Sequence, residues 1–223
     1  MFTRGEPPGS PPLLDRLLVL ASGSPRRRAL LAGLGLDFDV VPSGVEEESF
    51  SGGRPEGLVR RLARAKAEEV AAQMPDAVVL AADTFVVLRG EVLNKPRDAA
   101  DAREMLARLR NRSHRVLTAV CLITPRKRTR IEQATTRVRM RPFGQEEVEA
   151  WIHSGGALDK AGAYAIQDSE FAPVESYEGC YCNVMGLPLL TALRMLREAG
   201  INWPESGAMP AACGTCPLAP PPL

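Results

Sequence analysis

The stretch Leu17-Leu-Val-Leu-Ala-Ser-Gly-Ser-Pro-Arg-Arg-Arg28 decides how this chain folds. Its first half is apolar and predicts a short buried strand, followed by a tight turn of small residues. Ser24 and Pro25 then predict the start of a helix, because serine suits the N-cap and proline suits the first helical position. A strand, a tight turn and a helix in this order are typical of an α/β protein.

Arg26, Arg27 and Arg28 follow at the start of the predicted helix. That end of a helix already carries about half a positive charge from the macrodipole, so it repels three guanidinium groups. Two interpretations remain open. The segment is either a solvated basic turn, or a site where backbone N–H groups, the Ser22 and Ser24 hydroxyls and the guanidinium groups converge on a phosphate. The buried strand before it favours the phosphate site.

Apolar runs of strand length alternate with helical patterns through the rest of the chain, which predicts an α/β fold. The runs at 84–88 and 91–93 flank Gly90 and predict a hairpin, and those at 115–124 and 129–139 predict a second antiparallel pair. The sheet is therefore expected to be mixed and flanked by helices. Strands are predicted at 17–21, 38–41, 77–82, 84–88, 91–93, 115–124, 129–139 and 163–167, and helices at 25–33, 56–73, 99–110, 146–154 and 188–199.

The 223 residues suit a single domain, predicted at 16–201, between a disordered N-terminal extension at 1–15 and a flexible Pro-rich tail at 202–223. A net charge of +1 gives no global field to attract nucleic acid or an anionic membrane, so we expect neither as a partner. The longest apolar runs are too short to span a bilayer, and the N-terminus lacks the apolar core of a signal peptide. We therefore expect a cytoplasmic protein.

The chain has five cysteines, Cys121, Cys180, Cys182, Cys213 and Cys216, and in a cytoplasmic protein we expect them to be reduced thiols. The last two have the CxxC spacing of zinc knuckles and redox turns. Cys180 and Cys182 could complete a set of four zinc ligands only if the tail folded back onto the domain. The sequence favours simple thiols over a metal or redox role.

Two charged residues interrupt apolar patterns. Asp83 follows the apolar run 78–82 and is either a turn-forming residue or a base or metal ligand at the end of a strand. Lys66 falls in the apolar stripe of the predicted 56–73 helix, together with Leu62. Its ammonium group either extends to solvent or reaches into a cleft to meet an anion.

Further polar residues lie at predicted turns. The carboxylates of 46–48 can hold Mg²⁺ beside a phosphate, Lys95 lies between Asn94 and Pro96 in a rigid turn, and the Gln167 amide suits the edge of a nucleobase. Together these residues indicate a nucleotide hydrolase. No GxxxxGK(S/T), GxGxxG, GxSxG or HExxH motif occurs in the sequence, which argues against a P-loop enzyme and a Rossmann dehydrogenase.

Several short motifs occur in the order of one known family. They are Leu20-Ala-Ser-Gly-Ser-Pro-Arg-Arg-Arg28, Gly44-Val-Glu-Glu47, Leu62-Ala-Arg-Ala-Lys-Ala67, Ala82-Asp-Thr84, Asn94-Lys-Pro96, Asp159-Lys-Ala-Gly162, Tyr164-Ala-Ile-Gln167 and Asn183-Val-Met-Gly-Leu-Pro188. Through them, over roughly residues 16–200, the chain resembles the Maf nucleotide pyrophosphatases. The resemblance implies a curved mixed sheet with a central cleft, as in the inosine triphosphatase-like fold, and a homodimer is compatible with it. It also implies that a nucleoside triphosphate is hydrolysed to monophosphate and pyrophosphate with a divalent metal, Mg²⁺ or Mn²⁺.

The resemblance further implies roles for single residues. Asp83 stands where the family has the carboxylate that accepts a proton from the attacking water. The implied phosphate ligands are Ser22, Arg27, Lys66 and Lys95, and the implied metal ligands are Glu47 and Asp83.

Arg26, Thr84 and Gln167 stand at three positions that the family associates with substrate class. Their combination resembles the branch that cleaves dTTP and UTP, whereas the branch acting on 7-methyl-GTP carries tryptophan, glutamine and glutamate there. We therefore expect dTTP, UTP and modified pyrimidine analogues as substrates. The alternatives are a pyrophosphatase for 7-methyl-GTP or another modified purine, and a non-catalytic nucleotide-binding regulator of cell division.

Overall fold

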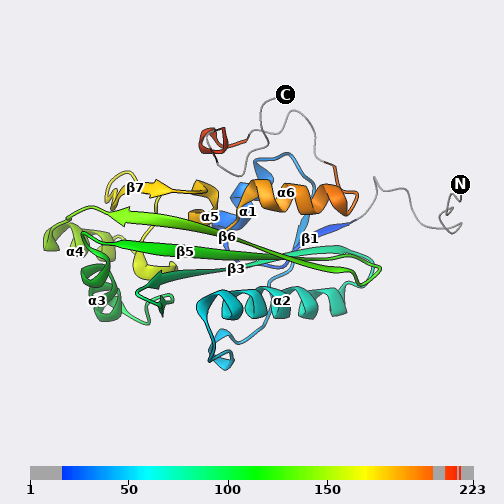
Figure 1. Cartoon of the computed structure of the whole chain (residues 1–223), viewed down its shortest axis with the longest axis horizontal. Coiled ribbons are helices and arrows are strands. Elements are labelled where there is room, and N and C mark those ends of the chain that lie inside the picture. Colours follow the sequence, from blue (N-terminus) through cyan, green and yellow to red (C-terminus); the bar gives the residue numbers. More distant parts are fainter. Residues whose placement is uncertain (1–16, 203–208, 215, 217–223) are drawn as a thin grey trace, which may run out of the picture.

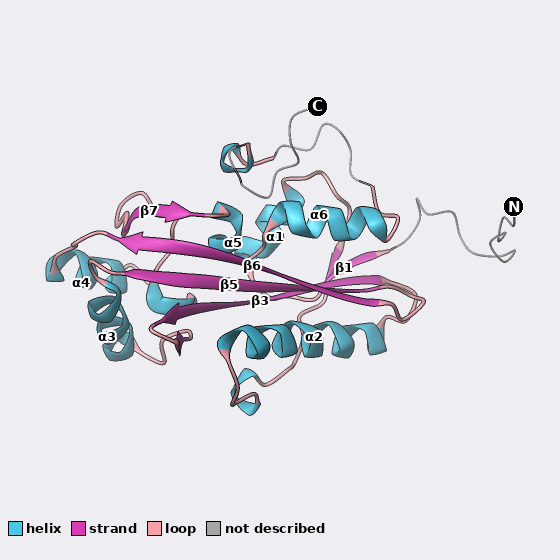
Figure 2. Cartoon of the chain, viewed as in Figure 1, coloured by secondary structure: helices cyan, strands magenta, loops and turns pink. Residues whose placement is uncertain are grey.

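A seven-stranded mixed sheet forms the centre of the molecule, in a computed structural model that describes residues 17–202, 209–214 and 216. The strand order is β2-β1-β3-β5-β6-β7, and β4 pairs with β3. β1 runs parallel to β2 and β3, and the other pairs are antiparallel. The predicted α/β class with a mixed sheet is confirmed (Figure 2).

The structure gives the following bounds. The strands are β1 (Leu18–Leu20), β2 (Asp39–Val40), β3 (Val78–Leu88), β4 (Glu91–Leu93), β5 (Ser113–Ile123), β6 (Thr129–Met140) and β7 (Val174–Glu178). The α-helices are α1 (Pro25–Ala32), α2 (Pro55–Gln73), α3 (Ala99–Leu109), α4 (Gln145–His153), α5 (Tyr181–Met185) and α6 (Leu189–Glu198). Short 3-10 turns occupy Glu47–Ser49, Ala161–Ala163 and Ala211–Cys213.

Helices cover both faces of the sheet. Figure 1 shows α2 on one face, α1, α5 and α6 on the other, and α3 and α4 at the far end of the long strands. Side chains of β3 pack in the cores on both faces of the sheet, because successive side chains of a strand point in opposite directions. Its Val79 and Ala81 pack in the core under α2, while Val78 and Leu80 pack with α1 and α6. β3 therefore carries side chains to both sides of the sheet at every point along its length.

The predicted elements differ from the structure in three places. The runs at 77–82 and 84–88 form one continuous strand, β3, so Asp83 lies inside a strand and not at its end. The predicted strand at 163–167 is wrong: the chain forms a 3-10 turn at Ala161–Ala163 and then continues without strand pairing. The sequence did not predict β7 or α5.

The two ends of the chain fall largely outside the described residues. The prediction of a disordered extension at 1–15 lies wholly outside them. Of the tail predicted to be flexible, residues 202, 209–214 and 216 are described, and both Cys213 and Cys216 are buried there. In the described part of the chain, no helix is long and apolar enough to cross a membrane.

Candidate active site

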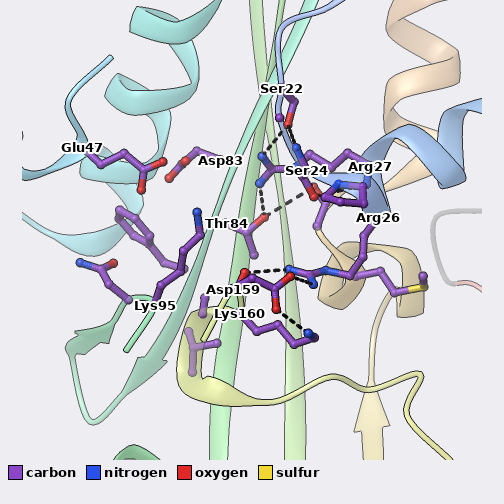
Figure 3. Close-up of a pocket in the computed structure, with 18 of the residues that line it drawn as sticks. Ser22, Ser24, Arg26, Arg27, Glu47, Asp83, Thr84, Lys95, Asp159 and Lys160 are labelled. Atoms are coloured by element: carbon purple, nitrogen blue, oxygen red, sulfur yellow. Dashed lines mark hydrogen bonds and ion pairs between the residues drawn. The ribbon is translucent and has the colours of Figure 1, made fainter. Parts of the chain in front are cut away.

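A cleft opens where one edge of β3 has no strand beside it. β1 pairs with β3 as far as Leu80, and β4 begins its pairing at Val86. The stretch between borders a cleft of about 660 Å³, which the loops after β1, β2 and β4 also line (Figure 3). Asp83 and Thr84 lie in this stretch and alternate in direction, so Asp83 faces α2 and Thr84 faces α1 and α5. The cleft therefore has two walls built on different faces of the sheet.

Every residue to which the resemblance assigns a role lines this cleft, whereas Arg28 is exposed outside it. The set is Ser22, Arg26, Arg27, Glu47, Lys66, Asp83, Thr84, Lys95 and Gln167. These positions span almost the whole domain in sequence, and the fold brings them together at the carboxyl end of β1.

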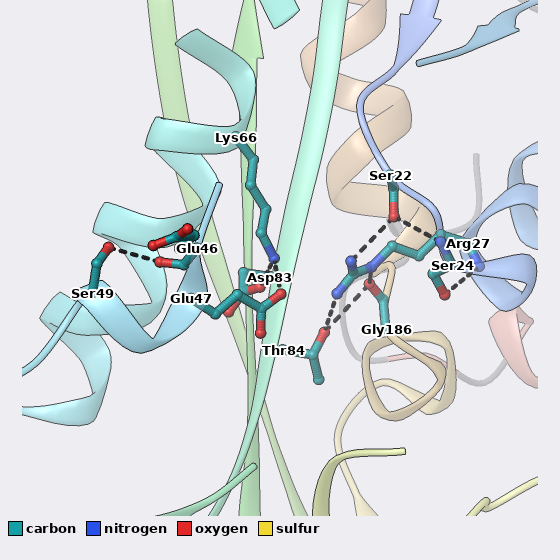
Figure 4. Close-up of polar contacts among 10 residues, drawn as sticks. All are labelled: Ser22, Ser24, Arg27, Glu46, Glu47, Ser49, Lys66, Asp83, Thr84 and Gly186. Atoms are coloured by element: carbon teal, nitrogen blue, oxygen red, sulfur yellow. Dashed lines mark hydrogen bonds and ion pairs between the residues drawn. The ribbon is translucent and has the colours of Figure 1, made fainter. Parts of the chain in front are cut away.

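The first wall is a chain of three charged groups. Lys66 of α2 donates from Nζ to Asp83 Oδ1 at 2.5 Å and to Glu47 Oε1 at 2.6 Å (Figure 4). Only 7% of Lys66 and 4% of Asp83 is exposed. Lys66 therefore does not extend to solvent, and the alternative of an ammonium group in a cleft is the correct one. Asp83 is not the turn-forming residue that the sequence also allowed.

Asp83 has the properties of a proton acceptor. Burial raises the pKa of its carboxyl group, and the nearby Lys66 and Arg27 charges offset that effect only in part. For Glu47, burial also acts to raise the pKa, but the hydrogen bond and charge of Lys66 outweigh it and the pKa is lowered. Asp83 Oδ2 is buried and has no hydrogen-bond partner among the described residues. One oxygen of Asp83 is thus fixed by Lys66, and the other is free to accept a proton or a ligand.

The same observation tests whether a divalent metal fits. Mg²⁺ is commonly held by one or two carboxylates, with substrate phosphates and water completing its shell. The unpartnered Asp83 Oδ2 and the half-exposed Glu47 carboxylate are suitable oxygen donors. No group of three or more His, Cys, Asp or Glu side chains among the described residues is arranged to hold a metal. Asp83 and Glu47 therefore suit a divalent metal that is held by these two carboxylates together with the phosphates of a bound ligand.

The second wall is built on Arg27 in the first turn of α1. Ser24 caps the helix as predicted, accepting a hydrogen bond from the Arg27 backbone N–H at 3.4 Å. The Arg27 guanidinium donates to Gly186 O at 2.7 Å, to Thr84 Oγ1 at 2.9 Å and to Ser22 Oγ at 3.3 Å. These bonds use three of the five N–H donors of an arginine side chain. The others remain for an anion in the cleft.

A buried hydrogen-bond chain supports Arg27 from behind. Thr84 Oγ1 lies 2.9 Å from Thr118 Oγ1, and Thr118 donates to Asn183 O at 2.9 Å. Asn183 in turn donates to Val116 O at 3.0 Å. Thr118 could not be identified from the sequence, because a threonine inside a strand pattern looks like any other β-forming residue.

Gly186, which ends α5, allows Arg27 to come close. Its φ is 111°, a left-handed conformation that favours glycine. A Cβ atom at this position would lie 3.4 Å from Arg27 Nε and 3.5 Å from Thr84 Oγ1. The glycine in the motif Asn183–Pro188 therefore has a physical reason: its carbonyl can meet the guanidinium without a side chain in between.

Removing the Thr118 hydroxyl tests the supporting chain. In Thr118→Val, Thr84 and the Asn183 carbonyl each lose a partner, so Arg27 is held less firmly. We expect KM for the nucleotide that the sequence resemblance implies to rise by about 3–10-fold with a smaller change in kcat, and the free energy of unfolding to fall by about 1–3 kcal/mol. Thr118→Ser keeps the hydroxyl and should restore KM. Steady-state kinetics on both variants measure this, and an equal rise in KM for Thr118→Ser would contradict the assignment.

The remaining predicted residues lie around the mouth of the cleft. Arg26 Nη1 forms an ion pair with Asp159 Oδ2 at 3.0 Å, and Lys160 contacts the same carboxylate at 2.5 Å. Lys95 points its ammonium group into the cleft (Figure 3), and its charge contributes to the lowered pKa of Glu47. Gln167 is exposed at the rim. Asp159 was part of a sequence motif without a role, and the structure shows it as the partner of Arg26.

The two walls place cations on both sides of a buried carboxylate, as expected for a protein that binds a phosphorylated ligand and acts on it. Fold and cleft together define an α/β protein whose cleft is lined by cations and carboxylates. A family model described as Maf-like protein matches residues 17–199, and the chain belongs to this family. The resemblance seen in the sequence is confirmed.

Relatives with assigned activities cover nearly the whole chain. A protein of Thermomicrobium roseum called dTTP/UTP pyrophosphatase is 50% identical over 208 residues, which are 91% of this chain and 94% of that protein. Proteins of the same name from Syntrophomonas wolfei and Anaeromyxobacter dehalogenans are 44% and 48% identical, over 82% and 84% of this chain and 97% and 96% of their own. A solved nucleoside-triphosphatase / dITP/XTP pyrophosphatase from Mycobacterium abscessus is 18% identical with a TM-score of 0.39, covering 62% of this chain and 93% of that one. This TM-score is too low to establish a shared fold.

Proposed function

We propose that this protein is a nucleoside triphosphate pyrophosphatase that cleaves dTTP and UTP to the monophosphate and pyrophosphate. The observation that carries this proposal is the unpartnered Oδ2 of buried Asp83, in one cleft with Lys66, Arg27 and Lys95. A carboxylate of this kind can activate water beside cations that bind phosphates. The name dTTP/UTP pyrophosphatase, shared by relatives that are 44–50% identical, supports the choice of substrate.

In the proposed reaction Asp83 acts as general base. Its Oδ1 is held by Lys66, so Oδ2 accepts the proton of a water molecule that attacks the α-phosphorus. The raised pKa makes the carboxylate a stronger base than an exposed aspartate, provided that it is ionised. Lys66 contributes to that ionisation, because its positive charge opposes the effect of burial.

The cations of both walls stabilise the leaving group. Arg27 is fixed by three hydrogen bonds and can donate its other N–H groups to phosphate oxygens. Lys95 enters from the opposite side, on the segment after β4. Because Arg27 is fixed before the substrate arrives, its guanidinium group needs little reorganisation when charge develops on the departing pyrophosphate. A Mg²⁺ or Mn²⁺ ion, for which Glu47 and Asp83 are suitable ligands, would neutralise phosphate charge when bound.

The preference for a pyrimidine rests on the rim of the cleft. Arg26 is held by Asp159, and Gln167 is exposed nearby with a free amide face for a base edge. The Thr84 hydroxyl is already bonded to Arg27 and Thr118, so its influence on the base is exerted through the position of Arg27. The cytoplasmic location and a homodimer remain predictions.

Pyrophosphate release from a nucleotide panel tests the function. We expect release from dTTP and UTP with Mg²⁺ or Mn²⁺, more slowly from CTP, and little from 7-methyl-GTP or ITP. Modified pyrimidines such as 5-methyl-UTP should be cleaved as well. Release mainly from a purine would keep the mechanism and overturn the interpretation of Arg26, Thr84 and Gln167. Binding without release from any nucleotide would instead support the non-catalytic regulator.

A further inference from the structure

Four of the five cysteines gather where the C-terminal tail returns to the domain. Cys180 and Cys182 lie at the start of α5, and Cys213 and Cys216 lie at the end of the short helix Ala211–Cys213 and just beyond it. Figure 1 shows this tail helix, in red, beside α5. All four side chains are buried in the core cluster that also contains α1 and α6. Two segments about thirty residues apart thus meet through their sulfur atoms.

The thiols contact one another as pairs across this junction. Cys182 Sγ lies 3.5 Å from Cys213 Sγ in a buried position. Cys180 contacts Cys182 and Cys216, and the Cys182 hydrogen bond is the main reason that the pKa of Cys180 is lowered to about 6. No three of these side chains are arranged around a point that could hold a metal, within the residues that the structure describes. The contacts therefore favour pairing of sulfurs over a shared metal ion.

We propose that Cys182 and Cys213 are a site of reversible oxidation, at which a small disulfide such as glutathione disulfide converts them into an intrachain disulfide bond. Buried cysteines commonly act as small apolar residues, and Cys121, buried within β5, fits that description. Cys182 and Cys213 differ from Cys121 because each has a second sulfur in contact and because the two lie on separate segments.

In this thiol–disulfide exchange the small disulfide is the oxidant. Cys213 is the slightly more exposed of the two, so its sulfur attacks one sulfur of the small disulfide, and its proton leaves with the small thiol that is released. Cys182 then attacks the Cys213 sulfur, and its proton passes to the small thiolate that is displaced. The second small thiol leaves. Two electrons pass from the two cysteines to the small disulfide, and the protein keeps one new S–S bond.

The new bond would fasten the tail to the segment that positions Arg27. α5 is followed directly by Gly186, whose carbonyl accepts from Arg27, and it includes Asn183, which binds Thr118. A bond between Cys182 and Cys213 lowers the conformational entropy of the unfolded chain. The midpoint of thermal unfolding should therefore rise by about 5–10 °C.

Peptide mapping of the full chain tests the proposal. Cleavage after lysine and arginine places Cys180 and Cys182 in the peptide 161–194, and Cys213 and Cys216 in the peptide 198–223. After treatment with glutathione disulfide and alkylation without reduction, these peptides should be recovered linked, and tandem fragmentation should place the bond between Cys182 and Cys213. The Cys121 peptide should remain alkylated. The double variant Cys180→Ser/Cys216→Ser should still link, whereas Cys182→Ser/Cys213→Ser should not.

Three results would overturn the proposal. The first is no linked peptide in the oxidised wild-type protein. The second is a bond confined to Cys180 and Cys216, which persists in Cys182→Ser/Cys213→Ser. The third is one equivalent of zinc in the purified protein that protects all four thiols from oxidation, since the sulfurs would then be metal ligands. The first and third measurements use the wild-type chain and do not depend on the variants folding.

Discussion

Replacing Asp83 with asparagine is expected to lower kcat for dTTP by about 10²–10⁴-fold while nucleotide binding is retained. Asparagine has nearly the same shape and can keep an oxygen near Lys66, but it cannot accept the proton of the attacking water. Steady-state pyrophosphate release measures kcat, and binding of a non-hydrolysable dTTP analogue measures affinity.

Asp76→Asn provides the matched control, because Asp76 is exposed and lies outside the cleft. It should leave kcat unchanged. Turnover of Asp83→Asn within a few-fold of the wild-type value would show that another group takes the proton. A loss of both turnover and binding would show instead that Asp83 mainly organises the site.

Replacing Lys66 with methionine should lower kcat/KM by about 10²-fold and move the acid side of its pH profile to higher pH. Methionine is similar in length but removes the charge that holds Asp83 and Glu47. The Lys66 charge acts to lower the pKa of Asp83, so its removal raises that pKa further. Asp83 works as a base only when ionised, so a larger fraction of the enzyme is inactive at any given acidic pH. Activity should therefore recover in part as the pH is raised.

The pH series is run beside Arg64→Met, which removes an exposed cation from the same helix. That variant should keep both the rate and the profile of the wild-type enzyme. An unshifted profile in Lys66→Met would contradict the electrostatic coupling between Lys66 and Asp83, even if the rate fell.

The first strand, turn and helix could be predicted because each has a local cause. An apolar run, a serine cap and a proline at the first helical position act over a few residues, and the structure places β1 and α1 close to the predicted bounds. The position of Lys66 in an apolar stripe was also visible in the sequence. What its ammonium group meets there depends on the packing of α2 against β3.

Asp83 shows where sequence reasoning fails. Aspartate is unfavourable inside strands, so the sequence pattern predicts two separate strands on either side of Asp83. In the structure β3 continues through it, because the adjoining edge is open to the cleft and Lys66 compensates the charge. Tertiary contacts between distant segments override local preference at this position, as expected at a functional site.

The wrong strand at 163–167 and the missed elements β7 and α5 also have physical causes. The mostly apolar run 163–167 predicts a strand, but Gly162 and Ala163 both have positive φ. They turn the chain so that residues 163–165 pack in the core near α3 and α4. β7 has few apolar residues, and α5 is only five residues long, so neither produces a clear period. The contact between the tail cysteines and α5 forms because residues 211–213 and 216 fold back against α5, and no local sequence pattern predicts this.

Hydrolysis of dTTP in water labelled with ¹⁸O tests the central claim most directly. If Asp83 activates water for attack on the α-phosphorus, mass spectrometry should find the label in the thymidine monophosphate and none in the pyrophosphate. Label in pyrophosphate, or release of single phosphates, would place the attack at another phosphorus and contradict the account.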